Sequence, residues 1–258
     1  MMSHLSYSHW LQENISNSTK PIEKKDKTRA KLKIAASSLL NFTPYQELHI
    51  HEICKKANVG AGTFYRYFKG KKELTEEILE ELIQHFFRLM STAGKENQEN
   101  SMFELFTQAN LSFFRFADAN HGLFRCLIHA NAEEYQLGNI FEKSTSFWAV
   151  RVTQAILQSH DKNNTDVNIK MELNEACTLT IVHCLASMLD DLAARLTFRN
   201  DQTLKSLFAD NDLDEVSSAK FLAVLWHRII FGCDPKGHTA SEFFKTSNLD
   251  SIKSHRQI

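Results

Sequence analysis

The sequence predicts an all-α fold in which a small N-terminal helical domain precedes a larger helical domain. The first observation behind this prediction is a scarcity of turn formers, since the 258 residues include only 8 Gly and 3 Pro. Sheet-rich folds need frequent turns, which use Gly and Pro for their backbone angles. The second observation is that apolar residues recur at helical spacing along most of the chain. The third is an uneven distribution of charge, which separates the two domains.

Charge divides the chain at about residue 72. Residues 20–72 contain 13 Lys and Arg against 4 Asp and Glu, a net charge of +9, whereas residues 73–258 contain 17 against 26, a net charge of −9. The whole-chain net charge of −1 therefore conceals a basic block ahead of an acidic body. A basic block predicts either a surface for a polyanion or a solvated helix face, and charge alone leaves both interpretations open.

Targeting and redox signals predict a cytoplasmic protein without a membrane span. Residues 1–17 lack the basic segment and apolar run of a signal peptide. The most apolar stretch, Phe221–Phe231, is interrupted by His227 and Arg228 and is shorter than the roughly 18 apolar residues that a span needs. The five Cys are widely spaced and form no CxxC motif, which is typical of reduced thiols.

The first elements are an arm and a helix. Residues 1–22 are polar and rich in Ser and Asn, and we expect a flexible N-terminal arm there. A helical pattern begins at Lys24, and Pro44 ends or bends it. The apolar residues of this helix form one stripe at i, i+3, i+4, i+7 and i+8, namely Leu32, Ala35, Ala36, Leu39 and Leu40.

Two shorter helices follow. The first ends at Asn58, a residue type that tolerates the left-handed backbone of a tight turn. The second covers residues 60–67, and Gly70 separates it from a longer helix that begins near Glu73. Three helices, the last two joined by a short turn, have the spacing of a helix-turn-helix domain, which we place at residues 23–72. A generic three-helix bundle gives a similar pattern.

A compact motif separates these two interpretations. The run Gly62-Thr63-Phe64-Tyr65-Arg66-Tyr67-Phe68, followed by Lys71 and Leu74, resembles the DNA-binding domain of the tetracycline-repressor (TetR) family. The resemblance covers about residues 28–80. It implies a transcriptional regulator, a repressor by default, that binds double-stranded palindromic operator DNA as a homodimer and responds to a small-molecule effector. The sequence leaves activation open.

The resemblance also implies which residues contact DNA. A short helix presented N-terminus first fits the major groove, so the small residues at 60–63 face or approach bases, and His51 on the preceding helix reaches a base. The tyrosine hydroxyls and Lys71 are directed at phosphates, although core packing is the other interpretation of each aromatic residue. The expected DNA-binding residues are His51, Gly60, Ala61, Gly62, Thr63, Tyr65, Arg66, Tyr67 and Lys71.

The acidic body is predicted to contain four or more helices after a polar break at residues 94–101. We place the effector-binding and dimerisation domain at residues 73–232 and a C-terminal tail at residues 233–258. Two helices of the body, near residues 173–196 and 221–230, are apolar on nearly every side. Such helices are buried or lie at an interface, so we expect them to form a four-helix contact between two subunits, as the family does.

The resemblance further implies an effector pocket in the body. Of the 19 Phe in the chain, several lie along residues 103–147 and suit a small apolar or aromatic ligand, although phenylalanines at helical spacing also build cores. Tyr135 is a further polar candidate. The ligand-binding residues that we expect are Asn110, Phe113, His129 and Trp148.

No catalytic group, cofactor or metal site is predicted, and therefore no enzyme activity. Neither GxGxxG nor GxxxxGK[ST] occurs, and no Ser/His/Asp or Cys/His triad has supporting local sequence. His129 and Glu133, four residues apart, and Cys177 and Cys184, seven apart, keep a helical metal or thiol sensor open as an alternative. A small helical enzyme whose basic N-terminal bundle docks a partner is the other alternative.

Overall fold

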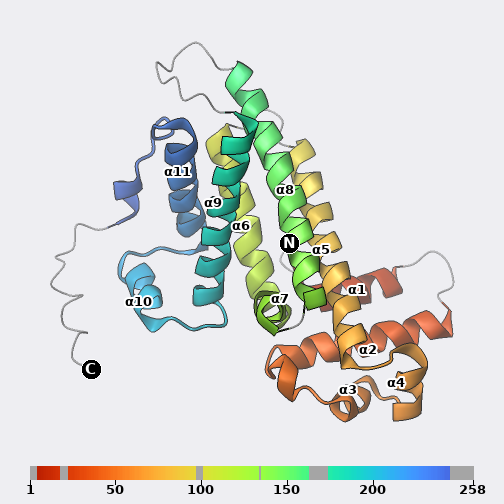
Figure 1. Cartoon of the computed structure of the whole chain (residues 1–258). Helices are drawn as coiled ribbons and strands as arrows, with labels where there is room; N and C mark the ends of the chain where they lie inside the picture. Colours follow the sequence, from red (N-terminus) through yellow and green to blue (C-terminus); the bar gives the residue numbers. More distant parts are fainter. Residues whose placement is uncertain (1–4, 18–22, 97–100, 134, 163–173, 245–258) are drawn as a thin grey trace.

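Figure 1 shows the computed structural model, which describes residues 5–17, 23–96, 101–133, 135–162 and 174–244. Every regular element within these ranges is helical, as the scarcity of Gly and Pro predicts. In chain order the elements are α1 (Tyr7–Ser16), α2 (Lys24–Leu40), the 3-10 segment η2 (Tyr45–Glu47), α3 (Ile50–Ala57), α4 (Ala61–Tyr67), α5 (Lys71–Glu96), α6 (Met102–Ala119), α7 (His121–Glu133), α8 (Tyr135–Lys162), α9 (Glu175–Leu196), α10 (Gln202–Asp210), α11 (Glu215–Phe231) and the 3-10 segment η3 (Ala240–Phe243).

Helices α2, α3 and α4 form the small N-terminal domain, called the head below, and α5 extends from the head into the rest of the molecule (Figure 1). Leu32, Ile53, Phe64 and Phe68 are fully buried and hold the head together. Burying such a side chain contributes roughly 1.5–3 kcal/mol. Helix α3 ends at Asn58 as the sequence predicts, with a left-handed φ of 54° that turns the chain toward α4.

Helix α1 lies where the sequence predicts a flexible arm, so that prediction is wrong for this segment. The buried Tyr7 side chain donates a hydrogen bond from its hydroxyl to Glu81 Oε2 (2.7 Å), and its backbone N–H donates to Asn120 Oδ1 (2.8 Å). Trp10 stacks on His85 with ring centroids 4.5 Å apart. Packing of these two aromatic residues outweighs the modest helix propensity of the surrounding Ser and Asn residues.

Helices α6 to α11 form the body, in which α6 packs along α11 and α8 packs along α9. Trp226 is fully buried where α11 meets α6, and its ring centroid lies 5.5 Å from that of Phe106. Polar side chains accept hydrogen bonds from the first free N–H groups of four body helices, which fixes where those helices begin. These capping residues are Ser101, Asn174, Asp201 and Asp214.

Helix α9 is long and apolar enough, with a mean hydropathy of 1.3, to meet the length and composition criteria for a membrane span. It packs against α6, α8, α10 and α11, as the core helix of a bundle does. One stripe of α9 is left exposed in the single chain. Its small side chains are Ala176, Cys177, Thr180, Cys184 and Ser187.

The segment after α11 packs against the body, although the sequence predicts only a tail from residue 233. The His238 ring stacks on Phe103 of α6 with centroids 4.3 Å apart. The ring centroids of Phe244 and of Phe221 in α11 lie 4.9 Å apart. The remainder of the expected tail, residues 245–258, lies outside the described residues.

Candidate functional site

The start of α4 forms an exposed surface with almost no side chains. Gly60, Ala61 and Gly62 are exposed, and no atom lies within 4 Å of the place where a Cβ would stand at either glycine. Thr63 follows as a half-buried residue, and His51 is exposed on α3. Because the backbone itself is accessible here, another molecule can approach α4 closely.

The aromatic residues of α4 divide between core and surface. Phe64 and Phe68 are buried, as the sequence predicts. Tyr65 is 60% exposed, and Arg66 beside it is also exposed. Tyr67 is half-buried and packs against the core of the head. Tyr65 and Arg66 are therefore the long polar side chains of α4 that stand most freely in solvent.

Lys71 is engaged within the head. Its Nζ donates hydrogen bonds to the carbonyl oxygens of Tyr45 (2.9 Å), Gln46 (2.9 Å) and Leu48 (3.1 Å). An ammonium group has three N–H donors, and these bonds use all of them. Lys71 therefore ties η2 to the first turn of α5, a role that the sequence did not indicate.

Two basic residues of the head face α5 rather than solvent. Arg29 pairs with Glu77, and the buried Lys33 pairs with both Glu77 and Glu81. Burial opposes ionisation of Glu77, but the bonds from Arg29 and Lys33 outweigh it and hold the pKa of Glu77 below its usual value. The positive charge on the surface of the head thus comes largely from other residues, the exposed Lys24, Lys25, Lys27, Lys31, Lys55, Lys56, Lys69 and Lys72.

The body meets the head at the C-terminal end of α2. Gly122, near the start of α7, packs so closely there that a Cβ would lie under 3.0 Å from the main chain of Leu40. The Gly122 N–H donates to Asn41 Oδ1 (3.3 Å). Arg125 Nη2 donates to the carbonyl oxygen of Leu40 (2.6 Å), which the end of α2 otherwise leaves unpaired, and to that of Thr43 (2.9 Å) in the following loop.

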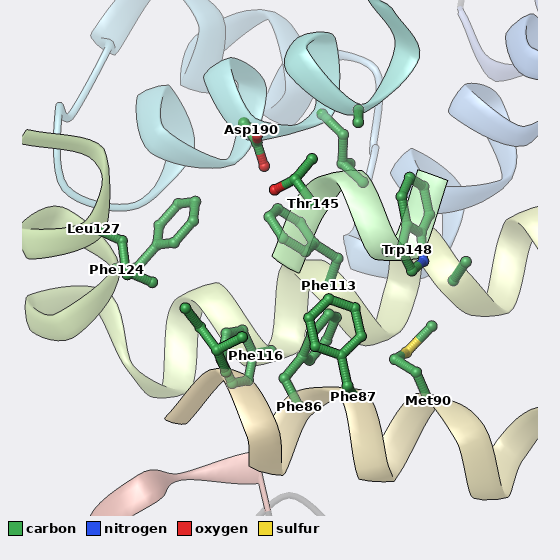
Figure 2. A pocket seen from close by; sticks show the side chains of 14 residues that line it. Phe86, Phe87, Met90, Phe113, Phe116, Phe124, Leu127, Thr145, Trp148 and Asp190 are labelled. Atoms are coloured by element: carbon green, nitrogen blue, oxygen red, sulfur yellow. The ribbon is translucent and has the colours of Figure 1, made fainter. Parts of the chain in front are cut away.

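An apolar cavity of about 60 Å³, called the inner chamber, lies between helices α5 to α9 (Figure 2). Among its described lining residues, six carry aromatic rings, and two side chains carry oxygen, those of Thr145 and Asp190. The lining residues are Ile83, Phe86, Phe87, Met90, Ala109, Phe113, Phe116, Phe124, Leu127, Thr145, Trp148, Ala186, Leu189 and Asp190.

A second cavity of about 200 Å³, called the outer chamber, adjoins the inner chamber. The two share Phe87, Met90, Ala109 and Trp148 as lining residues. The rest of the outer wall combines apolar residues with three polar side chains. Its further lining residues are Met102, Leu105, Phe106, Gln108, Ser112, Arg151, Val152, Ala155 and Trp226.

Asp190 of α9 faces the inner chamber, and Figure 2 shows its carboxylate pointing toward Thr145 of α8. Burial raises the pKa of the Asp190 carboxyl to about 7, because the charged form loses its hydration. The next residue behaves in the opposite way. Hydrogen bonds and charge from Arg195 and Arg199 lower the pKa of Asp191 at the protein surface.

The ligand-binding residues expected from the sequence have different places in the structure. Phe113 lines the inner chamber, and Trp148 lines both chambers. Asn110 lines neither chamber: it is fully buried, and its Nδ2 donates to the carbonyl oxygen of Ala219 (3.3 Å), which ties α6 to α11. The side chain of His129 lies outside the described residues, as does that of Tyr135.

Sequence reasoning missed Asp190 and the α5 rings of Phe86 and Phe87. The sequence does carry a signal for Asp190, because this acid interrupts a helix that is apolar on nearly every side. Phe86 lies on an apolar stripe of α5 with Leu74, Ile78 and Leu82. No pattern within α5 indicated that this stripe continues past the head to form a wall of the chamber.

The described residues show no feature that favours the metal or thiol sensor. Within the described part of the chain, no three His, Cys, Asp or Glu side chains gather as metal ligands. Cys177 and Cys184 are exposed. Burial raises the pKa of the Cys126 thiol to about 12, so this thiol is not reactive at neutral pH. The side chain of Glu133 lies outside the described residues.

Comparison with known proteins finds one family model that matches the head. Residues 35–78 match the family model of bacterial regulatory proteins, tetR family. The matched segment includes α3, α4 and the exposed residues at the start of α4. No curated protein matched the chain.

Solved structures extend the likeness over most of the chain. The fatty acid degradation regulator FadR from Bacillus halodurans is 18% identical, with a TM-score of 0.57 over 80% of this chain and 96% of its own. FadR from Bacillus subtilis, in complex with stearoyl-CoA, is 14% identical, with a TM-score of 0.55 over 76% and 96%. A tetR-family regulator from Rhodococcus is 15% identical, with a TM-score of 0.58 over 79% and 98%. At such identities the likeness establishes the fold alone.

Proposed function

We propose, on the premise that residues 35–78 belong to the tetR family of bacterial regulatory proteins, that this chain is a repressor which a small apolar or aromatic ligand releases from a palindromic operator. The observation that carries the proposal is the surface of α4. The family signature lies on a helix whose first residues, Gly60, Ala61 and Gly62, are exposed with open space around them. The proposal requires operator DNA, a second copy of the chain and one effector, in a cytoplasmic protein with no enzymatic step.

Helix α4 is assigned to the major groove as the recognition helix. Ala61, Gly62 and Thr63 are then placed against bases, where the threonine offers a hydroxyl and a methyl group. Tyr65 and Arg66 extend from the same helix toward the DNA backbone. Their exposure supports this assignment. The expected roles of His51, Gly60 and Tyr67 are kept in this proposal, and Lys71 is kept for its charge only, because its donors are already used.

Two copies of the head are needed, because one short recognition helix reads too few base pairs. A two-fold dimer reads two half-sites roughly 34–36 Å apart. We infer that α9 and α11 supply the subunit contact. In support, α9 exposes Cys177 and Cys184, and α11 exposes Val216 (36%) and Ile229 (47%) in the single chain.

The two chambers support an apolar ligand in the body. Their free volumes, about 60 and 200 Å³, are smaller than the roughly 300–1,000 Å³ of typical ligand sites. We therefore expect Phe87, Met90 and Trp148, which stand between the chambers, to move when a ligand binds. Since one structural neighbour was solved with stearoyl-CoA, long acyl chains are one class of ligand to test.

Helix α7 gives a physical route from ligand to DNA. Phe124 and Leu127 line the inner chamber, whereas Gly122 and Arg125 of the same helix contact the end of α2. A ligand that displaces α7 therefore displaces the head. Release from the operator further requires that the ligand bind the displaced state more tightly than the DNA-bound state.

Gel-shift titration tests this function. Labelled DNA that flanks the gene is titrated with the protein at low salt, and then with acyl-CoA esters, fatty acids and aromatic compounds. We expect a salt-sensitive shift that one ligand class reverses. A folded dimer, verified by light scattering, that gives no shift at low salt would refute the proposal.

A further inference from the structure

The inner chamber contains one acidic side chain, Asp190, and no basic one among its described lining residues. Asp190 faces the chamber, and no described side chain pairs with its carboxylate or donates a hydrogen bond to it. None of the described lining residues is Lys, Arg or His. Burial raises the pKa of this carboxyl to about 7.

The position of Asp190 is not explained by the needs of the fold. Its neighbour Asp191 finds two arginines at the surface, Arg195 and Arg199. Asp190 instead interrupts an apolar wall formed on the same helix by Ala186 and Leu189. Asp190 is half-buried, and a largely desolvated carboxyl without a partner destabilises a protein. Such groups concentrate at functional sites where a ligand completes them.

The aromatic rings around Asp190 are a second feature that suits a ligand-binding site. Phe113, Phe124 and Trp148 belong to the six aromatic residues of the wall, and Figure 2 shows them around the space that Asp190 and Thr145 face. The face of an aromatic ring carries partial negative charge and attracts cations, most strongly in a site without water. A carboxylate and several rings around one apolar space together favour an organic cation.

We propose that the inner chamber binds the protonated amine of an apolar amine ligand, with Asp190 as its counter-ion. This inference rests on the proposed function, because it names the class of effector that the chambers receive. The ammonium group donates to the Asp190 carboxylate and to the Thr145 hydroxyl. The apolar part of the ligand extends past Phe87 and Trp148 into the outer chamber, toward Phe106.

The same geometry disfavours anionic groups in the inner chamber. A carboxylate placed there would face Asp190 at close range, with no basic side chain among the described lining residues to offset the repulsion. A neutral alcohol of equal length fills the same space but supplies no charge. Amine, alcohol and carboxylate of one chain length therefore form a matched series of probes.

Octylamine, octanol and octanoate test the proposal by isothermal titration with the full-length protein. We expect octylamine to bind wild-type protein at least about tenfold more tightly than octanol, and octanoate to bind more weakly than both. Asp190→Asn should remove the advantage of the amine while leaving the affinity for octanol unchanged. Asp191→Asn, which alters the adjacent surface acid, should leave all three affinities unchanged.

Operator binding, measured in the same samples by fluorescence anisotropy, separates this inference from the proposed function. Equal affinities for octylamine and octanol, or an unchanged preference in Asp190→Asn, would overturn the amine proposal. Binding of none of the three probes by a protein that still binds its operator would also overturn it. In both cases, continued binding of the operator would leave the proposed regulator function standing. Failure of the folded protein to bind the operator would refute that function instead.

Discussion

At the scale of single residues, Lys71 fixes a loop beside the surface that we propose faces DNA. Its three hydrogen bonds hold the carbonyl oxygens of η2 and of Leu48, which precede α3. We expect Lys71→Ala to lower the free energy of unfolding by about 1.5–3 kcal/mol, because the loss leaves these carbonyls without their charged donor. Urea denaturation measures this change. Lys72→Ala, on an exposed neighbour, is the control, and an equal loss in both variants would exclude the loop-holding role.

Gly122 is the residue at which the body touches the backbone of the head. A methyl group at this position would collide with main-chain atoms of Leu40, which cannot swing aside as a side chain can. We expect Gly122→Ala to destabilise the protein by roughly 1–3 kcal/mol and to change its affinity for the operator. Thermal denaturation and anisotropy measure the two effects. Gly70→Ala, at a site with no atom within 4 Å, should leave the melting temperature unchanged; similar losses in both variants would count against a tight junction.

Asp190 makes stability depend on pH in a direction that can be calculated. Its pKa rises from the usual 3.8 to about 7 on folding, so between these values the folded state binds more protons than the unfolded state. The contribution of Asp190 to stability therefore falls as pH rises from about 4 to 7. We expect Asp190→Asn to melt at a higher temperature than wild-type protein at pH 8, with the advantage shrinking toward pH 4. A difference in melting temperature that stays constant over this range would show that the carboxyl does not titrate as described.

At the scale of elements, α1 is the helix whose contribution to the fold is least evident from the sequence. It joins α2 and α5 to Asn120 at the end of α6. We expect Trp10→Ala to lower the free energy of unfolding by at least about 1 kcal/mol through lost packing on His85. Gln12→Ala, on the exposed side of the helix, is the matched control for urea denaturation. Equal stability of the two variants would mean that α1 is not docked in solution.

The helices themselves were largely predictable, because their signals are local. Apolar spacing located α2, α3 and α9, and the turn at Asn58 followed from the backbone preference of that residue. Helix α1 was not predictable in this way, since the residues that Tyr7 and Trp10 contact, Glu81 and His85, lie more than 70 positions away in the sequence. For the same reason, the full wall of the inner chamber could not be predicted from the sequence. Its residues come from five helices, and a pattern along one helix carries no information about the others.

At the scale of the whole molecule, the division of charge matches the division of structure. The basic block forms the head, and the excess of acidic residues lies in residues 73–258, so a net charge of −1 describes neither part. Part of the basic charge is held within the protein by Glu77 and Glu81, which the sequence did not reveal. Under the proposed function, the exposed lysines of the head form the surface for DNA, and the apolar interior of the body receives the ligand.

Footprinting on the operator tests the central claim, that α4 of each subunit reads DNA, most directly. We predict that the dimer protects two symmetry-related half-sites whose centres lie about one helical turn, 10–10.5 base pairs, or a multiple of it apart. Replacing Tyr65 and Arg66 with Ala should abolish this protection while the protein remains a folded dimer. Protection that persists in this double variant, or none at low salt with the folded wild-type dimer, would contradict the account.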